Sequence, residues 1–275
     1  MTGDINNLKK IANGIRTDVI KMLVEAGSGH PAGSLGMADI FAALYFAIAR
    51  HDPANPKWEE RDRIILSNGH ICPVLYTTLA WAGYFPRQEL MTLRKLNTRL
   101  QGHPHNMALP GVENSSGPLG QGVSIAAGIA CALKHDRRDS HVFCLMGDGE
   151  LQEGQVWEAM MFINKYKLDN FIGIVDRNFI QIDGFTEDVM PLEDLAAKFS
   201  AFGLNVLQMD GHDFDDILTK IEDAKKSARA TVIIAKTVPG KGVSFMERRF
   251  EWHGKPPSPV EAEVALKELA QSAEI

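Results

Sequence analysis

Short apolar runs alternate along the chain with longer segments in which apolar residues recur at helical spacing. The runs of strand length cover residues 63–66, 141–146, 171–175, 205–208 and 231–235. The segments of helical spacing cover residues 8–26, 37–50, 73–81, 87–96, 124–135, 155–166, 192–202, 214–227 and 260–270. Several runs are apolar at every position, which is typical of strands buried on both faces. This alternation predicts an α/β fold with a mostly parallel sheet covered by helices on both faces.

The predicted elements follow one another closely enough to form one domain. The sequence has 275 residues and contains no internal repeat, low-complexity stretch or long linker. That length can bury a substantial core, and we expect a single domain over residues 1–275. The strongest loop signals, rich in Gly and Pro, cover residues 100–120 and 239–259. Loops of about 20 residues in a compact domain are usually functional or disordered.

Charge and cysteine content narrow the cellular setting. The chain has 29 Lys and Arg residues against 35 Asp and Glu residues, a net charge of −6, so it lacks the basic surplus of nucleic-acid-binding proteins. Three widely spaced cysteines favour buried thiols in a reducing compartment. The N-terminal segment lacks the apolar core of a signal peptide, and no run of about 18 apolar residues occurs. We expect a cytoplasmic protein that binds neither nucleic acid nor membrane.

Polar residues follow the predicted strands at the edge where parallel sheets bind ligands. Gly147 and Gly149 flank Asp148 directly after one strand, and Asn178 follows the next strand. Flanking glycines let the backbone approach a phosphate, while carboxylate and amide oxygens suit Mg²⁺. Asp148 alone could instead cap a helix. The spacing to Asn178 favours a magnesium and diphosphate site.

Histidines occur in three glycine-flanked loops. His30, His70 and His103 stand in GSGHP, SNGH and QGHPH. A single loop histidine is usually a surface residue, but three such loops indicate a site that binds hydroxyl groups and transfers protons near pH 7. Zinc binding by His103 and His105 is a weaker alternative, because their spacing lacks a companion ligand pattern. Glu153 is by default a solvated carboxylate, although its place after Asp148 allows a role in proton relay.

A glycine-rich segment, GPLGQG at residues 117–122, precedes an Ala-rich helical stretch. It permits close backbone approach to a ligand. It lacks the Lys-Ser or Lys-Thr of a phosphate-binding loop of the Walker type, and it does not match the dinucleotide pattern. Nucleotide binding is therefore disfavoured.

Several motifs in this order resemble the transketolase family. They are GSGHPAGSLGMADI, RDRIILSNGH, QGHP, SSGPLGQGVSIAAG, MGDGELQEGQVWEA, DRNFIQIDG, DGHD, AKTVPGKGVSF and WHGKPP. Together they cover nearly the whole chain and resemble the N-terminal, thiamine-diphosphate-binding half of the enzyme, as it occurs in two-subunit transketolases. The resemblance implies an enzyme that uses Mg²⁺ and thiamine diphosphate to move a two-carbon ketol unit from a ketose to an aldose, usually as sugar phosphates.

The resemblance also implies residue roles, position by position. The positions that match metal ligands are Asp148, Asn178 and the main-chain carbonyl of Ile180. The positions that match cofactor contacts are His70, Gly117, Leu119, Gly149, Glu150, Asn178 and His253. The positions that match catalytic and proton-transfer groups are His30, His70, His103, His253 and Glu153. Arg177, Phe179 and the pair Cys72-Pro73 depart from the residues usual in the family, and they could reshape the cofactor pocket.

The family's pyrimidine-binding half has no counterpart among these motifs. We therefore expect it on a partner chain, the C-terminal transketolase subunit, in a heterotetramer with two copies of each chain. Three alternatives remain: the cofactor-binding subunit of another thiamine-diphosphate enzyme such as a 2-oxoacid dehydrogenase, a non-catalytic scaffold subunit, and a Mg²⁺-dependent phosphohydrolase that works on its own.

Overall fold

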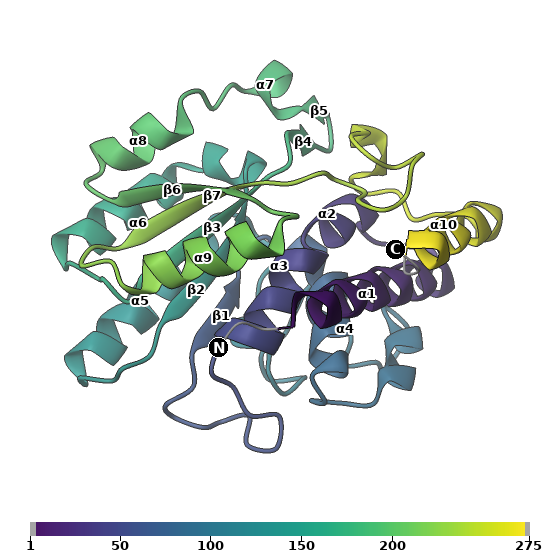
Figure 1. Cartoon of the computed structure of the whole chain (residues 1–275), viewed down its shortest axis with the longest axis horizontal. Coiled ribbons are helices and arrows are strands. Elements are labelled where there is room, and N and C mark those ends of the chain that lie inside the picture. The colour runs from purple at the N-terminus through teal and green to yellow at the C-terminus, as the bar shows by residue number, and fades with distance from the viewer. Residues whose placement is uncertain (1–3, 273–275) are drawn as a thin grey trace.

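A five-stranded sheet forms the centre of the molecule in the computed structural model, which describes residues 4–272 (Figure 1). Its strands are β1 (Arg63–Leu66), β2 (Val142–Gly147), β3 (Phe171–Arg177), β6 (Asn205–Asp210) and β7 (Thr231–Lys236). They lie in the order β1-β2-β3-β7-β6, and every neighbouring pair is parallel. The predicted α/β fold with a mostly parallel sheet is confirmed.

Helices cover both faces of this sheet because successive strand residues point to opposite sides. In β2, Val142, Cys144 and Met146 pack in one apolar cluster. That cluster includes residues of α5 (Gln121–His135), α6 (Gly154–Lys165) and α8 (Leu195–Ala201). The intervening Phe143 and Leu145 pack in the other cluster. That second cluster includes residues of α1 (Ile5–Ala26), α3 (Ala38–Ala43), α4 (Cys72–Trp81) and α9 (Phe214–Lys225).

Helix α1 carries the chain toward the carboxyl edge of the sheet. Asp4 caps its start by accepting bonds from two backbone N–H groups, and Gly27 ends it with a φ of 60°. A left-handed residue at this position is the usual helix stop, and glycine adopts it without steric cost. The helix predicted over residues 8–26 is confirmed, and His30 follows four residues after its end.

Two predicted helices differ from the structure. Residues 37–50 form α3 and a π-helical turn over Leu44–Ile48, and residues 31–36, for which no helix was predicted, form the short helix α2 (Pro31–Gly36). Pro31 at the first helical position pre-sets the backbone angle for a helix start. The helix predicted over 87–96 is wrong: only a 3₁₀ turn over Arg87–Thr92 forms, because Arg94 and Asn97 adopt φ of 59° and 62°.

Residues 180–189, for which no helix or strand was predicted, form a small projection next to the sheet edge. It consists of β4 (Ile180–Gln181), paired antiparallel with β5 (Gly184–Phe185), and α7 (Thr186–Val189). The chain ends with α10 (Pro259–Ser272), which packs on α1. Within residues 4–272, no helix has both the length and the apolar character to cross a membrane.

Candidate active site

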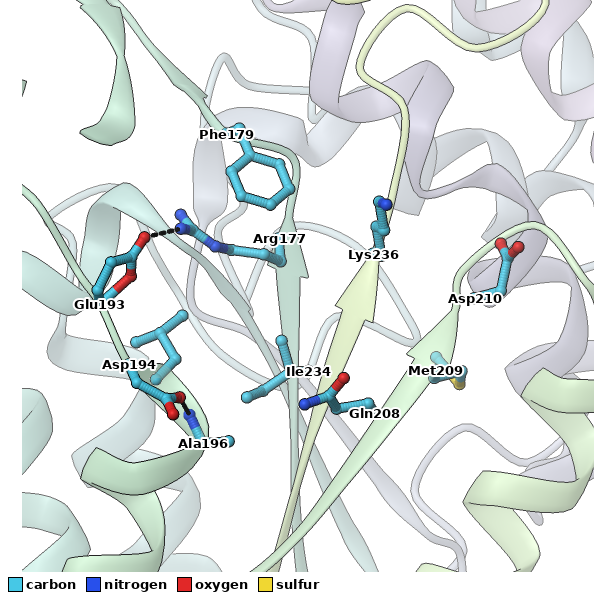
Figure 2. A pocket seen from close by; sticks show the side chains of 11 residues that line it. Arg177, Phe179, Glu193, Asp194, Ala196, Gln208, Met209, Asp210, Ile234 and Lys236 are labelled. Carbon is cyan, nitrogen blue, oxygen red and sulfur yellow. Dashed lines mark hydrogen bonds and ion pairs between the residues drawn. The ribbon is translucent and has the colours of Figure 1, made fainter. Parts of the chain in front are cut away.

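Two hollows open at the carboxyl edge of the sheet. One, of about 610 Å³, lies beyond β3, β6 and β7, and charged side chains of both signs line it, among them Arg177, Asp210 and Lys236 (Figure 2). The other, of about 500 Å³, lies beyond β1, β2 and β3. It is lined by all the residues predicted for catalysis, cofactor binding or metal binding: His30, His70, His103, Gly117, Leu119, Asp148, Gly149, Glu150, Glu153, Asn178, Ile180 and His253. This second hollow is the candidate active site.

Three histidines from distant parts of the chain meet at one end of this site. His30 begins α2, His70 lies in a 3₁₀ turn after β1, and His253 follows the 3₁₀ turn Phe250–Trp252. Their ring centroids are 5.2 Å apart for His30 and His70, 5.7 Å for His30 and His253, and 5.1 Å for His70 and His253. Nδ1 of His30 is buried and has no hydrogen-bond partner among the described residues, so it is available to a ligand.

Burial keeps these imidazoles neutral. It lowers the pKa of His30 to about 4, with His253, Arg94 and His103 adding to the effect. Burial also lowers the pKa of His70 well below its ordinary value, and it lowers that of His253. A neutral imidazole both donates and accepts a hydrogen bond, which suits the recognition of hydroxyl groups.

His103 reaches the site from the loop after the 3₁₀ turn Arg87–Thr92. Its ring packs against Gly117, which has a φ of 154° and where an added β-carbon would lie 3.4 Å from the ring. Burial and then the charge of Arg94 lower the pKa of His103. Neighbouring His105 is exposed, and residues 4–272 contain no set of three or more His, Cys, Asp or Glu side chains placed to hold a metal. The alternative of zinc binding therefore gains no support.

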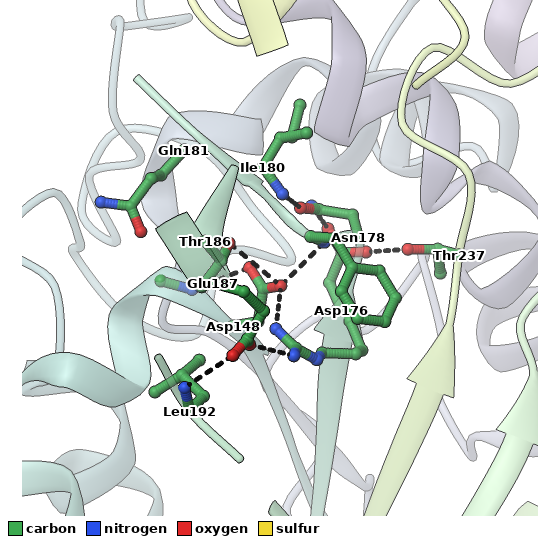
Figure 3. Close-up of polar contacts among 12 residues, drawn as sticks. Asp148, Asp176, Asn178, Ile180, Gln181, Thr186, Glu187, Leu192 and Thr237 are labelled. Atoms are coloured by element: carbon green, nitrogen blue, oxygen red, sulfur yellow. Dashed lines mark hydrogen bonds and ion pairs between the residues drawn. The ribbon is translucent and has the colours of Figure 1, made fainter. Parts of the chain in front are cut away.

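Asp148 lies at the other end of the site, at the end of β2 (Figure 3). One carboxylate oxygen, Oδ2, accepts bonds from the backbone N–H of Phe179 at 2.8 Å and from Arg177 at 2.9 Å. The other oxygen, Oδ1, accepts only from the backbone N–H of Gly149, at 2.8 Å, among the described residues. Burial raises the pKa of Asp148, and Arg177 opposes this rise. The carboxylate is thus held in one orientation, and Oδ1 retains a lone pair for a further ligand.

Hydrogen bonds with its neighbours fix the orientation of the Asn178 amide and show which of its two ends is the oxygen. Its Nδ2 donates to Asp176 at 2.7 Å, and its Oδ1 accepts from the backbone N–H of Ile180 at 3.0 Å (Figure 3). Thr237 donates to the other oxygen of Asp176. Burial raises the pKa of Asp176 to about 7, although its two hydrogen bonds oppose the rise. The carboxylates of Asp148 and Asp176 and the amide oxygen of Asn178 line the same cavity as the histidines.

Glu150 and Glu153 differ in their surroundings. The buried carboxylate of Glu150 accepts bonds from the hydroxyl of Ser67 and from the backbone N–H groups of Gly120 at 2.7 Å and Gly147 at 3.0 Å. It therefore joins three loops of the site, and both of its oxygens accept hydrogen bonds from the protein. Glu153 is exposed at the rim of the cavity, directly before α6, where a solvated carboxylate was expected.

Several site residues were not predicted from the sequence. Both polar side-chain atoms of Asn68 and the hydroxyl of Ser116 are buried without a partner in the described chain. Asn68 approaches Gly147, and Ser116 packs against Gly69, where an added β-carbon would meet its hydroxyl at 2.5 Å. Asn68 and Ser116 lie beside the hollow without lining it, whereas Gln181, Ile182 and Asp183 line it. The position of Asn68, two residues after the end of β1, was the one signal available in the sequence.

Comparisons with known proteins agree with this geometry. The family model described as "Transketolase, thiamine diphosphate binding domain" matches residues 7–271. A 6-deoxy-6-sulfo-D-fructose transketolase subunit of Clostridium sp. is 42% identical over 248 residues, which cover 90% of each chain. An apulose-4-phosphate transketolase subunit of Phocaeicola vulgatus is 39% identical, with 94% of this chain and 92% of that protein covered.

A solved structure extends the comparison. The transketolase of Campylobacter jejuni superposes with a TM-score of 0.90 at 38% identity. The match covers 98% of this chain and 43% of that chain. The chain therefore belongs to the transketolase family, as its thiamine diphosphate-binding domain. The resemblance drawn from the sequence motifs is thereby confirmed.

Proposed function

We propose that this chain is the thiamine-diphosphate-binding subunit of a two-subunit transketolase, which transfers a two-carbon ketol unit from a ketose to an aldose. The observation that carries the proposal is one cavity with neutral histidines at one end and the oxygens of Asp148 and Asn178 at the other. A diphosphate and its metal suit the oxygen end, and a polyhydroxylated substrate suits the histidine end.

The oxygen end fits Mg²⁺ and a diphosphate. Mg²⁺ is usually held by one or two protein carboxylates, and water and ligand phosphates complete its shell. Asp148 Oδ1, Asn178 Oδ1 and the carbonyl of Ile180 would supply the protein ligands. Gly149, which follows Asp148 and lines the cavity, has no side chain to obstruct the approach of a phosphate. The unpartnered Asn68 and Ser116 side chains add hydrogen-bonding groups near the same cavity.

The histidines would divide between the substrate and the cofactor. When bound, the cofactor supplies the carbanion chemistry of ketol transfer. His30 and His103 would hydrogen-bond substrate hydroxyls and hold or move a proton at the carbonyl oxygen. His70 and His253 would contact the diphosphate, and His253 would also reach toward the reacting carbon. Exposed Glu153 would join a proton relay to a second site across the contact between chains.

The remaining parts of the enzyme would come from a partner. Two relatives with nearly the same length are named as subunits, while the Campylobacter transketolase chain is more than twice as long as the segment matched. We propose that the partner is a C-terminal subunit, in a heterotetramer of two copies of each chain. The single domain over 1–275, whose first and last three residues lie outside the described structure, would supply only the cofactor's diphosphate end. A cytoplasmic location would suit its three free thiols.

The substrates would be ketoses and aldoses that carry an anionic group. The two relatives named above have names that include a sulfo sugar and a sugar phosphate. We propose the same class for this chain, with the anionic group bound mainly by the partner chain.

Cofactor binding tests the proposal directly. Calorimetric titration of the full chain with thiamine diphosphate and Mg²⁺ should show binding that needs both, and Asp148→Ala should weaken it at least about tenfold, because a metal ligand is lost. Asp188→Ala, at an exposed position of α7, is the matched control and should bind as the parent does. Binding of equal strength in Asp148→Ala would contradict the assignment, and phosphate-ester hydrolysis by the chain alone would favour the phosphohydrolase.

A further inference from the structure

Arg94 lies behind the histidine end of the site and does not line it. It belongs to the segment that leads from the 3₁₀ turn Arg87–Thr92 to His103. Its φ is 59°, a left-handed conformation that is unfavourable for a residue with a β-carbon. Such strain persists only where the surrounding structure imposes it, and it is concentrated at functional sites.

The guanidinium of Arg94 joins two loops that carry histidines. Its Nη1 donates to the hydroxyl of Ser28 at 2.6 Å, and its Nη2 donates to the carbonyl of Gly102 at 3.2 Å. Ser28 stands two residues before His30, and Gly102 stands one residue before His103. The planar fork of arginine fixes the angle between its two contacts, which a flexible lysine cannot do.

The packing around this fork is tight. A β-carbon on Gly102 would lie 2.9 Å from Nε of Arg94 and 3.0 Å from its Cζ. Any other residue at position 102 would therefore displace the guanidinium. Nε itself is buried without a partner in the described chain. The carbonyl of Gly102 also accepts from Sγ of Cys72, at 3.2 Å, which fixes the same loop from its other side. Cys72 is one of the departures from the family noted in the sequence.

The two hydrogen-bond partners of Arg94 are neutral, so its positive charge acts on the nearby imidazoles. His30 faces His70, His103 and His253 as well as Arg94, and burial together with the charges of His253, Arg94 and His103 lowers its pKa. Arg94 therefore disfavours protonation of both His30 and His103 while holding their loops.

We propose that Arg94 is a positioning residue, whose guanidinium sets the separation and orientation of His30 and His103 for substrate hydroxyls. The proposal rests on the proposed function, which assigns these two histidines to the substrate. It also explains why an arginine occupies a strained backbone position outside the cavity. The left-handed backbone directs the Arg94 side chain so that its guanidinium reaches both Ser28 and Gly102.

Two substitutions, made in the assembled complex, distinguish the backbone strain of Arg94 from the charge and the forked hydrogen bonding of its guanidinium. Arg94→Gly removes the strain together with the side chain, and Arg94→Lys keeps the strain and the charge but loses the fork. Arg99→Gln, in the same segment, is the matched control, because Arg99 pairs with Glu89 on the half-exposed surface. The KM for the ketose, kcat, the Kd for thiamine diphosphate and the melting temperature are measured for each variant.

We expect Arg94→Gly to melt within about 3 °C of the parent, because relief of the left-handed strain offsets the lost hydrogen bonds. Its ketose KM should rise about tenfold or more, since misplaced contact groups weaken binding. Its cofactor Kd should not change. Arg94→Lys should show a similar KM, and Arg99→Gln should match the parent. An unchanged KM in Arg94→Gly, or equal losses of cofactor and ketose binding, would overturn the proposal.

Amide hydrogen exchange tests the role of Arg94 without relying on enzyme activity, so it can fail or succeed separately from the proposed function. In the full chain, amides of residues 100–103 should exchange faster in Arg94→Gly than in Arg99→Gln. If the parent complex transfers no ketol unit, the proposed function fails, and the exchange result alone decides whether Arg94 holds the loop. Unchanged exchange at these amides would overturn the positioning role.

Discussion

At the scale of single residues, burial governs the candidate site. The imidazoles of His30, His70, His103 and His253 all have lowered pKa values, with burial as the first cause. They are therefore neutral at pH 7 and act through hydrogen bonds rather than through charge. Each neutral imidazole offers one N–H donor and one acceptor, which suits sugar hydroxyls at His30 and His103 and phosphate oxygens at His70 and His253.

The lowered pKa of His30 predicts a pH dependence of stability. The unfolded chain binds this proton near pH 6.5 and the folded chain only near pH 4, so the free energy of unfolding falls as pH drops from 6.5 to 4. Above pH 6.5 the contribution is fully present. His30→Asn, which cannot titrate, should show a shallower decline over this range in urea unfolding experiments.

The comparison between parent and variant reports on His30 together with its effect on His70, whose pKa the neighbouring His30 also lowers. The slopes should differ by up to about one proton between pH 4 and 6.5. Parallel stability curves for the two proteins would show that His30 does not titrate differently in the folded chain.

Site residues could be predicted from the sequence where they follow a strand or lie in a loop flanked by glycines. Asp148, Asn178 and His70 met that condition, and parallel strands bring such positions to one edge. Asn68 and Ser116 were missed because an unpartnered buried side chain can be seen only once the loops are packed. The engagement of the Glu150 carboxylate with three loops was equally invisible in the sequence.

At the scale of elements, buried polar contacts join helices and loops that are distant in the sequence. Asp39 on α3 pairs with Arg16 on α1 at 2.5 Å and accepts from His212 at 2.7 Å. The other ring nitrogen of His212 accepts from the backbone N–H of Val238 at 2.7 Å. Burial raises the pKa of Asp39, but the charge of Arg16 and the hydrogen bond from His212 lower it by more. The pKa of Asp39 therefore lies below its ordinary value.

Removing this carboxylate should be costly. Asp39→Ala leaves the buried Arg16 without its counter-charge, and such losses destabilise proteins by about 3 kcal/mol or more. Glu222→Ala breaks the partly exposed pair with Lys225 on α9 and should cost less than about 1 kcal/mol. Chemical unfolding of both variants checks the difference, and equal costs would contradict the role of the buried network.

Glu150 provides a second test at this scale. Glu150→Gln turns an acceptor of three hydrogen bonds into a side chain whose NH₂ faces a donor, and we expect a loss of about 2 kcal/mol. Glu263→Gln, exposed on α10, is the control and should be neutral. A neutral Glu150→Gln in thermal unfolding would show that the three loops hold their places without this carboxylate.

Element prediction succeeded for long periodic segments and failed at short ones. Helix α1, with buried residues at helical spacing, and the apolar strands were predicted closely. Residues 87–96 have the apolar spacing of a helix, but Arg94 adopts a left-handed conformation and its side chain bonds the distant Ser28, a contact that local spacing does not reveal. The projection formed by β4, β5 and α7 has too few residues for a periodic pattern to appear.

At the scale of the whole molecule, two exposed apolar side chains lie at and beside the rim of the candidate site, next to the polar Gln181 and Asp183. Ile182 lines the cavity and is 67% exposed, and Met190, directly after α7, is 58% exposed. Single exposed apolar residues are common, but a group beside a cavity favours contact with a partner. We expect the proposed C-terminal chain to cover this rim.

A substitution at the rim tests this contact. Ile182→Ser should weaken the association of the two chains about tenfold, because burial of an isoleucine side chain on binding is lost. Val260→Ser, 72% exposed on α10, is the matched control and should leave association unchanged. Analytical ultracentrifugation of the reconstituted complex compares the two variants. Equal association constants for Ile182→Ser and Val260→Ser would show that the partner does not bind at Ile182.

The most direct measurement of the central claim is ketol transfer by the complex that forms around this chain. The chain is tagged and isolated from a native extract with Mg²⁺ and thiamine diphosphate present, its partner is identified by native mass spectrometry, and both are assayed separately and together. The account predicts transfer only when both chains and the cofactor are present. Transfer by either chain alone, or none by the complex with any ketose donor, would contradict it.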